Sequence, residues 1–538
     1  MTLPQPVSYD ETKSRGRVAR FVDMIERVGN RLPDPITLFF ILAIAVVVIS
    51  WIAARAGVTA FHPGTGEAVE VVNLMSFEGL RRMLTGAVGN FTAFPPLGLV
   101  IVVIIGIAVT ERSGLIGVAL KRLVTAVPPS LLTMTVVFAG VMSSMAVDAG
   151  YVVLVPLGAM IFAAVGRHPL AGFAAGFAGV SGGFSANLLI TSLDPLLAGI
   201  STEAARLIDP AYEVNSTANY YFMIASVALL TVLGTWVTAK FVEPRLGRWN
   251  SAEAGELLPE ETGEITEQQR KGLAAAGIAL VVMMALFALM VVPSGAPLRD
   301  PEAAGAEFLV QRIRPFFDSI VTLIMVLFLV TGLAYGIVAG TIRSDRDVAR
   351  MSSEGVAILG SYIVLAFAAA QFIAYFNWSN LGLILAINGA SALRAVGFTG
   401  LPLLLSFVIV AAFINLFIGS ASAKWAVMAP VFVPMFMLTG YSPEVVQVSY
   451  RVGDSVTNII TPLMLYFPVI LVFAQRYDRR AGIGTIISLM LPYSVAFFMG
   501  WIVMLAVWLL AGFPLGPGAP VEYIPGGLTG APATPATP

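Results

Sequence analysis

The sequence contains no cysteine and only two histidines among its 538 residues. Without cysteine the chain forms no disulfide and performs no thiol chemistry. His62 and His168 each precede a proline in a polar connection, which argues against a histidine-based metal site. No Walker A sequence (GxxxxGK[ST]) and no HExxH motif are present, so neither ATP-driven transport by this chain alone nor zinc-dependent hydrolysis is indicated. These absences predict a protein that is not an enzyme.

Charged residues are also scarce, at 12% of the chain compared with about 25% in soluble domains. Hydrophobic residues make up 57% of the chain, and the mean hydropathy is +0.86. They gather in many long apolar runs, whereas an outer-membrane barrel would show alternating segments of about ten residues. The composition therefore predicts an all-α polytopic membrane protein that is embedded in the lipid bilayer.

Basic residues separate the predicted cytoplasmic connections from the periplasmic ones. Residues 1–34 are rich in arginine and have apolar residues at helical spacing, which predicts an amphipathic cytoplasmic segment. The charged stretch 243–271 predicts a cytoplasmic linker between a first half (35–242) and a second half (272–512), and a Gly- and Pro-rich tail (513–538) is expected in the periplasm. The apolar runs predict nine transmembrane helices, at about 36–54, 96–109, 170–199, 220–241, 272–293, 316–341, 355–376, 443–475 and 483–511.

Two further apolar regions are predicted to be re-entrant hairpins. Residues 130–166 hold two short apolar runs around the polar sequence SSMAVDAG (143–150), and residues 401–440 repeat this pattern around GSASAKW (419–425). The spans at 170–199 and 443–475 are interrupted by SGGFSAN (181–187) and GDSVTN (453–458), so we expect both to be broken helices. Polar, irregular backbone survives at membrane depth only where it is buried in protein or lines a cavity.

The two hairpin regions align with each other. A constant offset pairs Pro156 with Pro430, and after a short gap a second constant offset pairs Gly182 with Gly453 and Asn187 with Asn458. Glycine, proline and asparagine carry this alignment because they interrupt helices, whereas shared apolar residues align by chance. The first copy is expected to enter from the cytoplasm and the second from the periplasm. This inverted repeat is typical of secondary transporters, whose site lies where the broken helices meet.

Hydroxyl, amide and carboxylate oxygens occur at corresponding places in both copies and suit a hard monovalent cation. They predict a possible Na⁺ site formed by Asp148, Ser185, Asn187, Ser455 and Asn458. Two alternatives stay open at this point. The hydroxyl and amide groups can simply satisfy freed backbone groups, and Asp148 can cap a helix.

A second set of side chains suits an aromatic anion. Arg451 and Asp454 are three residues apart and share a helix face, so the guanidinium can hold an anionic group while Asp454 or Asp194 carries a proton or binds Na⁺. Trp425 can stack on an aromatic substrate. The alternatives are that Trp425 packs in the core, that Arg451 and Asp454 form a structural ion pair, and that Lys424 snorkels to the membrane surface.

The stretches GSASAKWAVMAP (419–430) and GDSVTNIITPLMLYFP (453–468) resemble the p-aminobenzoyl-glutamate transporter (AbgT) family, and the resemblance covers nearly the whole chain. It implies a homodimer in the bacterial inner membrane with nine spans and two hairpins. It also implies p-aminobenzoyl-glutamate and related aromatic acids as substrates, and sulfonamide export in some members. The site residues that it implies are Asp194, Asn415, Ser422, Trp425, Pro443, Arg451, Asp454 and Pro462.

The leading hypothesis is a secondary transporter that exports an aromatic carboxylate or sulfonamide and is coupled to H⁺ or Na⁺. It would have no tightly bound cofactor and no nucleic-acid partner. One alternative is a Na⁺-coupled importer of p-aminobenzoyl-glutamate or a dicarboxylate. An alternative of another class is a channel or a non-transporting membrane subunit. The inverted repeat favours transport, and Trp425, Arg451 and Asp454, which have no charged or indole equivalents in the first copy, place substrate recognition mainly in the second.

Overall fold

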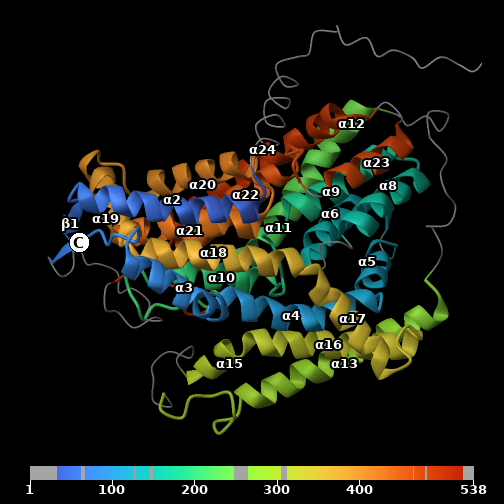
Figure 1. The fold of residues 1–538 in the computed structure, drawn as a ribbon. Coiled ribbons are helices and arrows are strands. Elements are labelled where there is room, and N and C mark those ends of the chain that lie inside the picture. The colour runs from blue at the N-terminus through green and yellow to red at the C-terminus, as the bar shows by residue number, and fades with distance from the viewer. Residues whose placement is uncertain are drawn as a thin grey trace, which may run out of the picture.

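The computed structural model describes residues 33–61, 67–125, 128–145, 150–247, 265–303, 312–464, 466–478 and 481–524, and these residues are mostly helical (Figure 1). Residues 1–32 of the predicted amphipathic segment 1–34 and most of the linker 243–271 lie outside them. Within the described residues, eight helical stretches are long and apolar enough to cross a membrane. They are α2 (Pro35–Arg55), α3 with α4 (Phe77–Thr92 and Pro95–Arg112), α11 with its extension (Tyr220–Leu246), α13 (Glu267–Val291), α16 (Ile320–Ala339), α18 (Gly360–Trp378), α21 (Ala421–Leu438) and α24 (Ile483–Leu510).

The remaining elements are short. The first half contains α5 (Leu115–Thr125), η1 (Pro129–Leu131), α6 (Leu132–Met142), η2 (Ser143–Met145), η3 (Gly150–Leu154), α8 (Val155–Ala164), α9 (Pro169–Phe177), η4 (Ala178–Gly182) and α10 (Leu193–Ala205). The extension of α11 (Tyr220–Val237) consists of η5 (Thr238–Val242) and α12 (Glu243–Leu246). The second half adds α15 (Arg314–Asp318), α17 (Asp345–Ile358), α19 (Leu381–Ala395), α20 (Gly400–Asn415), α22 (Pro443–Asn458) and α23 (Phe467–Tyr477). A small antiparallel ribbon, β1 (Thr59–Phe61) and β2 (Ala68–Glu70), pairs Thr59 with Glu70.

The first hairpin region folds as α6 and α8, and both helices are too short to cross a bilayer of about 30 Å. Glycines let α8 pack closely on α9, since a Cβ placed on Gly158 would lie 2.8 Å from the backbone oxygen of Gly172. The predicted interruption of the span 170–199 is present, because η4 ends at Gly182 and α10 starts at Leu193.

The second hairpin region folds as α20 and α21. Ser420 caps α21 by accepting a hydrogen bond from the amide of Ala423. The helix α21 is 18 residues long and includes Pro430 and Pro434, so it is longer than the short arm we expected. The span 443–475 is interrupted as predicted, but later in the chain than expected. Residues 453–458 are still helical within α22, and the break lies between Asn458 and the start of α23 at Phe467.

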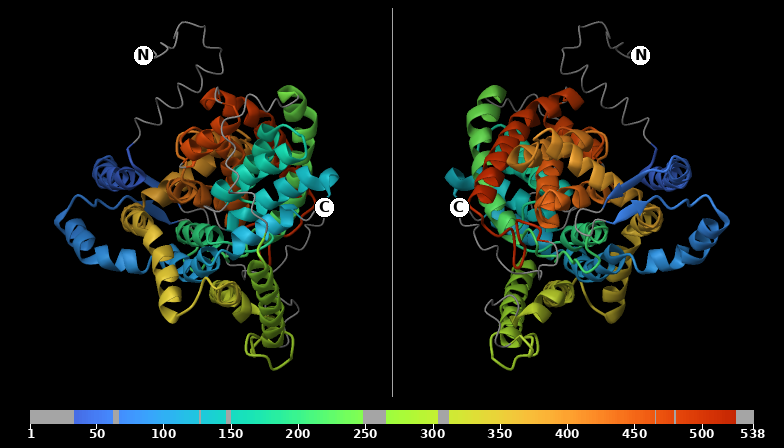
Figure 2. Two further views of the ribbon diagram at one scale, coloured as in Figure 1. Left: turned by 90° about the vertical axis from the view of Figure 1, so that its right-hand side faces the viewer. Right: turned by 90° about the vertical axis from the view of Figure 1, so that its left-hand side faces the viewer.

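Other helices and the start of the predicted tail pack around the two hairpin regions. At one edge, α13 packs on α16, which in turn packs on α4 (Figures 1 and 2). The helix α19 packs against α21. The first part of the predicted tail also contacts the core, because the amide of Ser442 donates to the carbonyl of Val521 (3.1 Å) at the start of α22. The broken helices of the two halves meet in the buried middle of the molecule, where α22 packs against η4 and α10.

Candidate functional site

The candidate site lies where α10 of the first half meets α21 and α22 of the second half. The helix α22 is unusual because its 16 residues are almost all buried although half of them are polar or charged. Ser442 caps it, and Pro443 occupies its first turn, where the missing N–H of proline costs no hydrogen bond. This start places Arg451 and Asp454 deep in the protein, where each is 2% exposed.

Arg451 forms an ion pair with Asp194, which lies at the start of α10 in the first half. A second oxygen of the Asp194 carboxylate accepts hydrogen bonds from the amide (2.7 Å) and the hydroxyl (2.9 Å) of Thr191. The alternative of an ion pair between Arg451 and Asp454 was therefore wrong. Both side chains lie on α22, but Arg451 contacts α10 whereas Asp454 contacts α21.

Lys424 is the partner of Asp454, and its ammonium group also donates to the side-chain oxygen of Asn415. The lysine is fully buried, so the expectation that it snorkels to the membrane surface was wrong. The amide nitrogen of Asn415 donates to the carbonyl of Asp454 (2.6 Å) and to the side-chain oxygen of Asn458 (2.8 Å). Asn415, which only the family resemblance indicated, thereby joins the end of α20 to α22.

Trp425 is fully buried and stacks on Tyr450, with 4.5 Å between the ring centroids. Its indole N–H donates to the hydroxyl of Ser201 (3.1 Å), which donates to Gln447 (2.7 Å), and Gln447 donates to Asn219 (2.9 Å). Sequence reasoning missed Tyr450, Ser201, Gln447 and Asn219. Ser201 offered only the signal of a polar residue within a mostly apolar helix, and the other three offered no distinct signal.

The predicted ion-binding residues fall into two separate groups. In the first half, Ser144 donates to the side-chain oxygen of Asn187, and the Ser185 hydroxyl is buried without a hydrogen-bond partner. In the second half, Asn458 accepts from Asn415, and the Ser455 hydroxyl is also buried without a partner. Asp148 lies outside the described residues. No cluster of three or more His, Cys, Asp or Glu side chains suitable for a metal occurs in the described part of the chain.

Three further predicted site residues lie at helix ends. The Ser422 hydroxyl is 3.3 Å from that of Ser420 in the first turn of α21. Pro443 opens α22 and lies eight residues before Arg451, or about 12 Å along the helix axis, so the two do not share one contact cluster. Pro462 follows the end of α22 in the non-helical segment. Pro443 thus marks the start of α22, and Pro462 lies four residues beyond its end.

The candidate site is closed in this structure. The gap beside Ser185 and Arg451, which Phe222, Met223 and Trp501 help to line, is too narrow for a water molecule. The guanidinium of Arg451 is incompletely bonded there, because its Nε has no partner and one Nη faces the sulfur of Met223.

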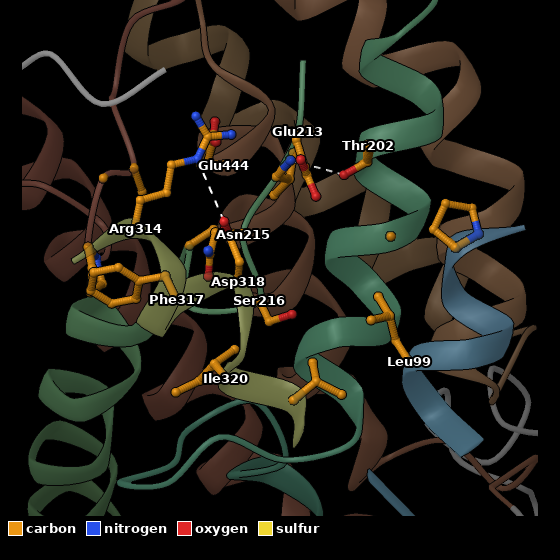
Figure 3. Close-up of a pocket in the computed structure, with 18 of the residues that line it drawn as sticks. Leu99, Thr202, Glu213, Asn215, Ser216, Arg314, Phe317, Asp318, Ile320 and Glu444 are labelled. Carbon is orange, nitrogen blue, oxygen red and sulfur yellow. Dashed lines mark hydrogen bonds and ion pairs between the residues drawn. The ribbon is translucent and has the colours of Figure 1, made fainter. Parts of the chain in front are cut away.

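A larger cavity of about 490 Å³ opens elsewhere, between the loop 213–218, α15 and the start of α22 (Figure 3). Glu213, Arg314, Asp318 and Glu444 line it. The backbone carbonyl of Glu444 accepts from Asn219 (3.0 Å), so this cavity-lining residue is joined to the row of hydrogen bonds that runs from Asn219 to Trp425.

Comparisons with known proteins agree with this architecture. The model of the family described as "AbgT putative transporter family" matches residues 20–523. The p-aminobenzoyl-glutamate transport protein of Escherichia coli (strain K12) is 40% identical over 512 residues, which cover 95% of this chain and 99% of that protein.

Two solved structures are also similar. The YdaH transporter of Alcanivorax borkumensis is 45% identical with a TM-score of 0.85, and the match covers 90% of this chain and all of that one. MtrF of Neisseria gonorrhoeae, whose structure is described as illuminating a class of antimetabolite efflux pumps, is 46% identical with a TM-score of 0.87, over 93% of this chain and all of that one. This chain therefore belongs to the AbgT family and is a multi-pass membrane transporter, not an enzyme.

Proposed function

We propose that this transporter is a secondary active one that moves p-aminobenzoyl-glutamate and related aromatic carboxylates, together with sulfonamide antimetabolites, and that an H⁺ or Na⁺ gradient drives it. The observation that carries the proposal is the incompletely bonded guanidinium of Arg451. Arginine has five N–H donors in a planar fork, but among the described residues only one carboxylate, that of Asp194, binds it. An oxygen of a substrate carboxylate or sulfonyl group can accept a hydrogen bond from the Nε–H, which has no partner.

The surroundings of Arg451 suit an aromatic acid. The unpartnered hydroxyl of Ser185 lines the same narrow gap and can donate to an anionic oxygen once the gap widens. Trp425 and Tyr450, on α21 and α22, form one aromatic stack beyond the lining of that gap, and a substrate ring can extend or replace such a stack. Because Asp194 belongs to the first half and Arg451 to the second, a change in how the halves pack alters access to the guanidinium.

The descriptions of the relatives support the same substrate class. The relative from Escherichia coli is named for transport of p-aminobenzoyl-glutamate, and the relative from Neisseria gonorrhoeae is described as illuminating antimetabolite efflux pumps. The proposal includes the family architecture of nine spans with two re-entrant hairpins, a homodimer and an inner-membrane location with a cytoplasmic N-terminus. The eight long apolar helices and the short apolar pairs α6–α8 and α9–η4 support that architecture.

A flux experiment tests the direction of transport and the identity of the coupling ion. Purified full-length protein in proteoliposomes is given labelled p-aminobenzoyl-glutamate on one side, with a pH gradient, a Na⁺ gradient or neither. We expect movement that is accelerated by one gradient and is driven from the side that corresponds to the cytoplasm. An opposite direction with Na⁺ dependence would instead support an importer. No movement under any gradient would contradict the proposal.

A tryptophan pair gives the matched controls for this assay. Trp425→Ala removes the buried ring and is expected to abolish flux. Trp236→Ala removes a ring that is 48% exposed on α11 and is expected to leave flux unchanged. Equal flux in both variants would remove Trp425 from the substrate site.

A further inference from the structure

Lys424 is the buried charge that the proposed substrate contacts leave unexplained. It lies in the first turns of α21, near the positive end of the helix dipole, where a cation is unfavourable. Its side chain is fully buried, and removing an ammonium group from water costs several kcal/mol unless partners compensate. Because both the helix dipole and burial disfavour a charged Lys424, its contacts must compensate for both costs.

Oxygen and aromatic groups surround the ammonium as they would surround a bound monovalent cation. Asn415 and Asp454 each supply a side-chain oxygen to it. The ring of Tyr450 lies 5.5 Å away, within the range of a cation–π contact. The hydroxyl of Tyr450 donates a hydrogen bond to Asp454 (3.4 Å) but carries no charge. Within the described residues, Lys424 is the one cation that forms an ion pair with this carboxylate.

The internal repeat shows that the two charges go together. The alignment of the two copies places Gly150 opposite Lys424 and, beyond its short gap, Gly183 opposite Asp454. At these two matched positions the first copy has neither an ammonium nor a carboxylate, and a Cβ on Gly150 would overlap the Ser143 hydroxyl. In their place the first copy has neutral oxygens, with Ser144 bonded to Asn187 and the Ser185 hydroxyl unpartnered.

We infer that the ammonium group of Lys424 is a tethered cation that permanently fills the cation position of the second half and neutralises Asp454. While Lys424 is present, a free monovalent cation such as Na⁺ therefore has no place on Asp454. This inference deepens the proposed ion coupling. Its relevance to transport rests on the proposed function, but the role of Lys424 as a cation for Asp454 can be tested without measuring flux.

The test replaces the tethered cation by one from solution. Lys424→Ala leaves Asp454 uncompensated and opens a space the length of the lysine side chain. The melting midpoint of the purified full-length protein is measured in detergent with chloride salts of choline, Na⁺ or ethylammonium at equal ionic strength. We expect the variant to melt several degrees below the wild type in choline, and to regain part of the loss in Na⁺ or ethylammonium. Ethylammonium is expected to leave the wild type unchanged.

A double variant and a surface lysine provide the controls. Lys424→Ala with Asp454→Asn has no charge to compensate, so it is expected to melt above the single variant in choline and to ignore the added cations. Lys240→Ala, which removes an exposed lysine, is expected to behave like the wild type. The inference is overturned if Lys424→Ala melts alike in all three salts, or if the double variant responds to cations as the single one does.

If Lys424→Ala cannot be purified as folded protein, the yields of folded single and double variants are compared instead of their melting midpoints. Recovery of folded protein in the double variant would then support the charge pair, and an equal loss in both variants would overturn it. Failure of the wild type to move any substrate would contradict the proposed function but would leave these melting results valid. Conversely, normal flux with no cation response in Lys424→Ala would overturn this inference alone.

Discussion

The ion pair between Arg451 and Asp194 supports the sharpest prediction, because it joins the two halves of the repeat at a position with almost no solvent exposure. The perturbation is Arg451→Met and Asp194→Asn, made separately and together. Each single change leaves one buried charge without its partner, whereas the double change leaves two neutral side chains of similar size.

The structure predicts that the two single substitutions lower the free energy of unfolding by different amounts. Breaking a buried ion pair costs about 3–5 kcal/mol. Arg451→Met is expected near the lower value, about 3 kcal/mol, because the Asp194 carboxylate keeps two hydrogen bonds from Thr191. Asp194→Asn is expected near about 5 kcal/mol, because the Nε of Arg451 already lacks a partner and one Nη faces only the sulfur of Met223. The double variant is expected to cost less than either single one, since no uncompensated charge remains.

Unfolding in mixed detergent micelles by added SDS measures these free energies, and the double-mutant cycle isolates the pair. Two single costs below about 1 kcal/mol that simply add in the double variant would refute the assignment of a buried, mutually compensating pair. Flux then separates stability from recognition. The double variant is expected to be folded but inactive, because it lacks the guanidinium, and a folded double variant with normal flux would remove Arg451 from the substrate site.

Two further predictions concern packing and pH. Gly453→Ala places a Cβ 2.5 Å from the backbone oxygen of Val408, so we expect a loss of about 1–3 kcal/mol in the same SDS unfolding assay, whereas Gly484→Ala, which meets no atom within 4 Å, is expected to be neutral or slightly stabilising. The backbone N–H of Arg343 donates to Asp347 (3.0 Å) and holds the pKa of that carboxyl below its usual range. Because the folded pKa is the lower one, this stabilisation is present at neutral pH and is lost as the pH falls below about 4. Amide hydrogen exchange in the first turn of α17, corrected for intrinsic rates, should accelerate over that range, and an Asp347→Asn variant that keeps the same acceleration would contradict this origin.

Local sequence features predicted the helices and their interruptions, because those depend on neighbours in the chain. Glycine and asparagine mark the end of η4 and of α22, and a serine with a following proline marks the start of α22. The pairing of buried charges could not be predicted in this way. Arg451 finds its partner 257 residues away, and Trp425 finds Ser201 at a distance of 224 residues.

Side-chain direction on α22 explains the two errors about charges. Arg451 and Asp454 are three residues apart, and this spacing alone favours a contact between them. Instead, Arg451 pairs with Asp194 on α10 and Asp454 pairs with Lys424 on α21. These buried pairs between helices replace the pair within α22 that the spacing favours. The same contacts hold Lys424 inside, although an isolated lysine near a helix end would extend to the surface. They also give the first half, through Asp194, a direct part in a cluster that we expected to belong mainly to the second.

The close approach of α8 and α9 limits how this protein can evolve. A side chain on Gly158 would collide with the backbone of Gly172, and one on Gly172 would collide still more closely with Gly158. Backbone atoms cannot withdraw as the end of a flexible side chain can, so no single substitution at either position is neutral, and two simultaneous substitutions only enlarge the collision. Sequence drift in this part of the first copy is therefore confined to the other faces of the two helices.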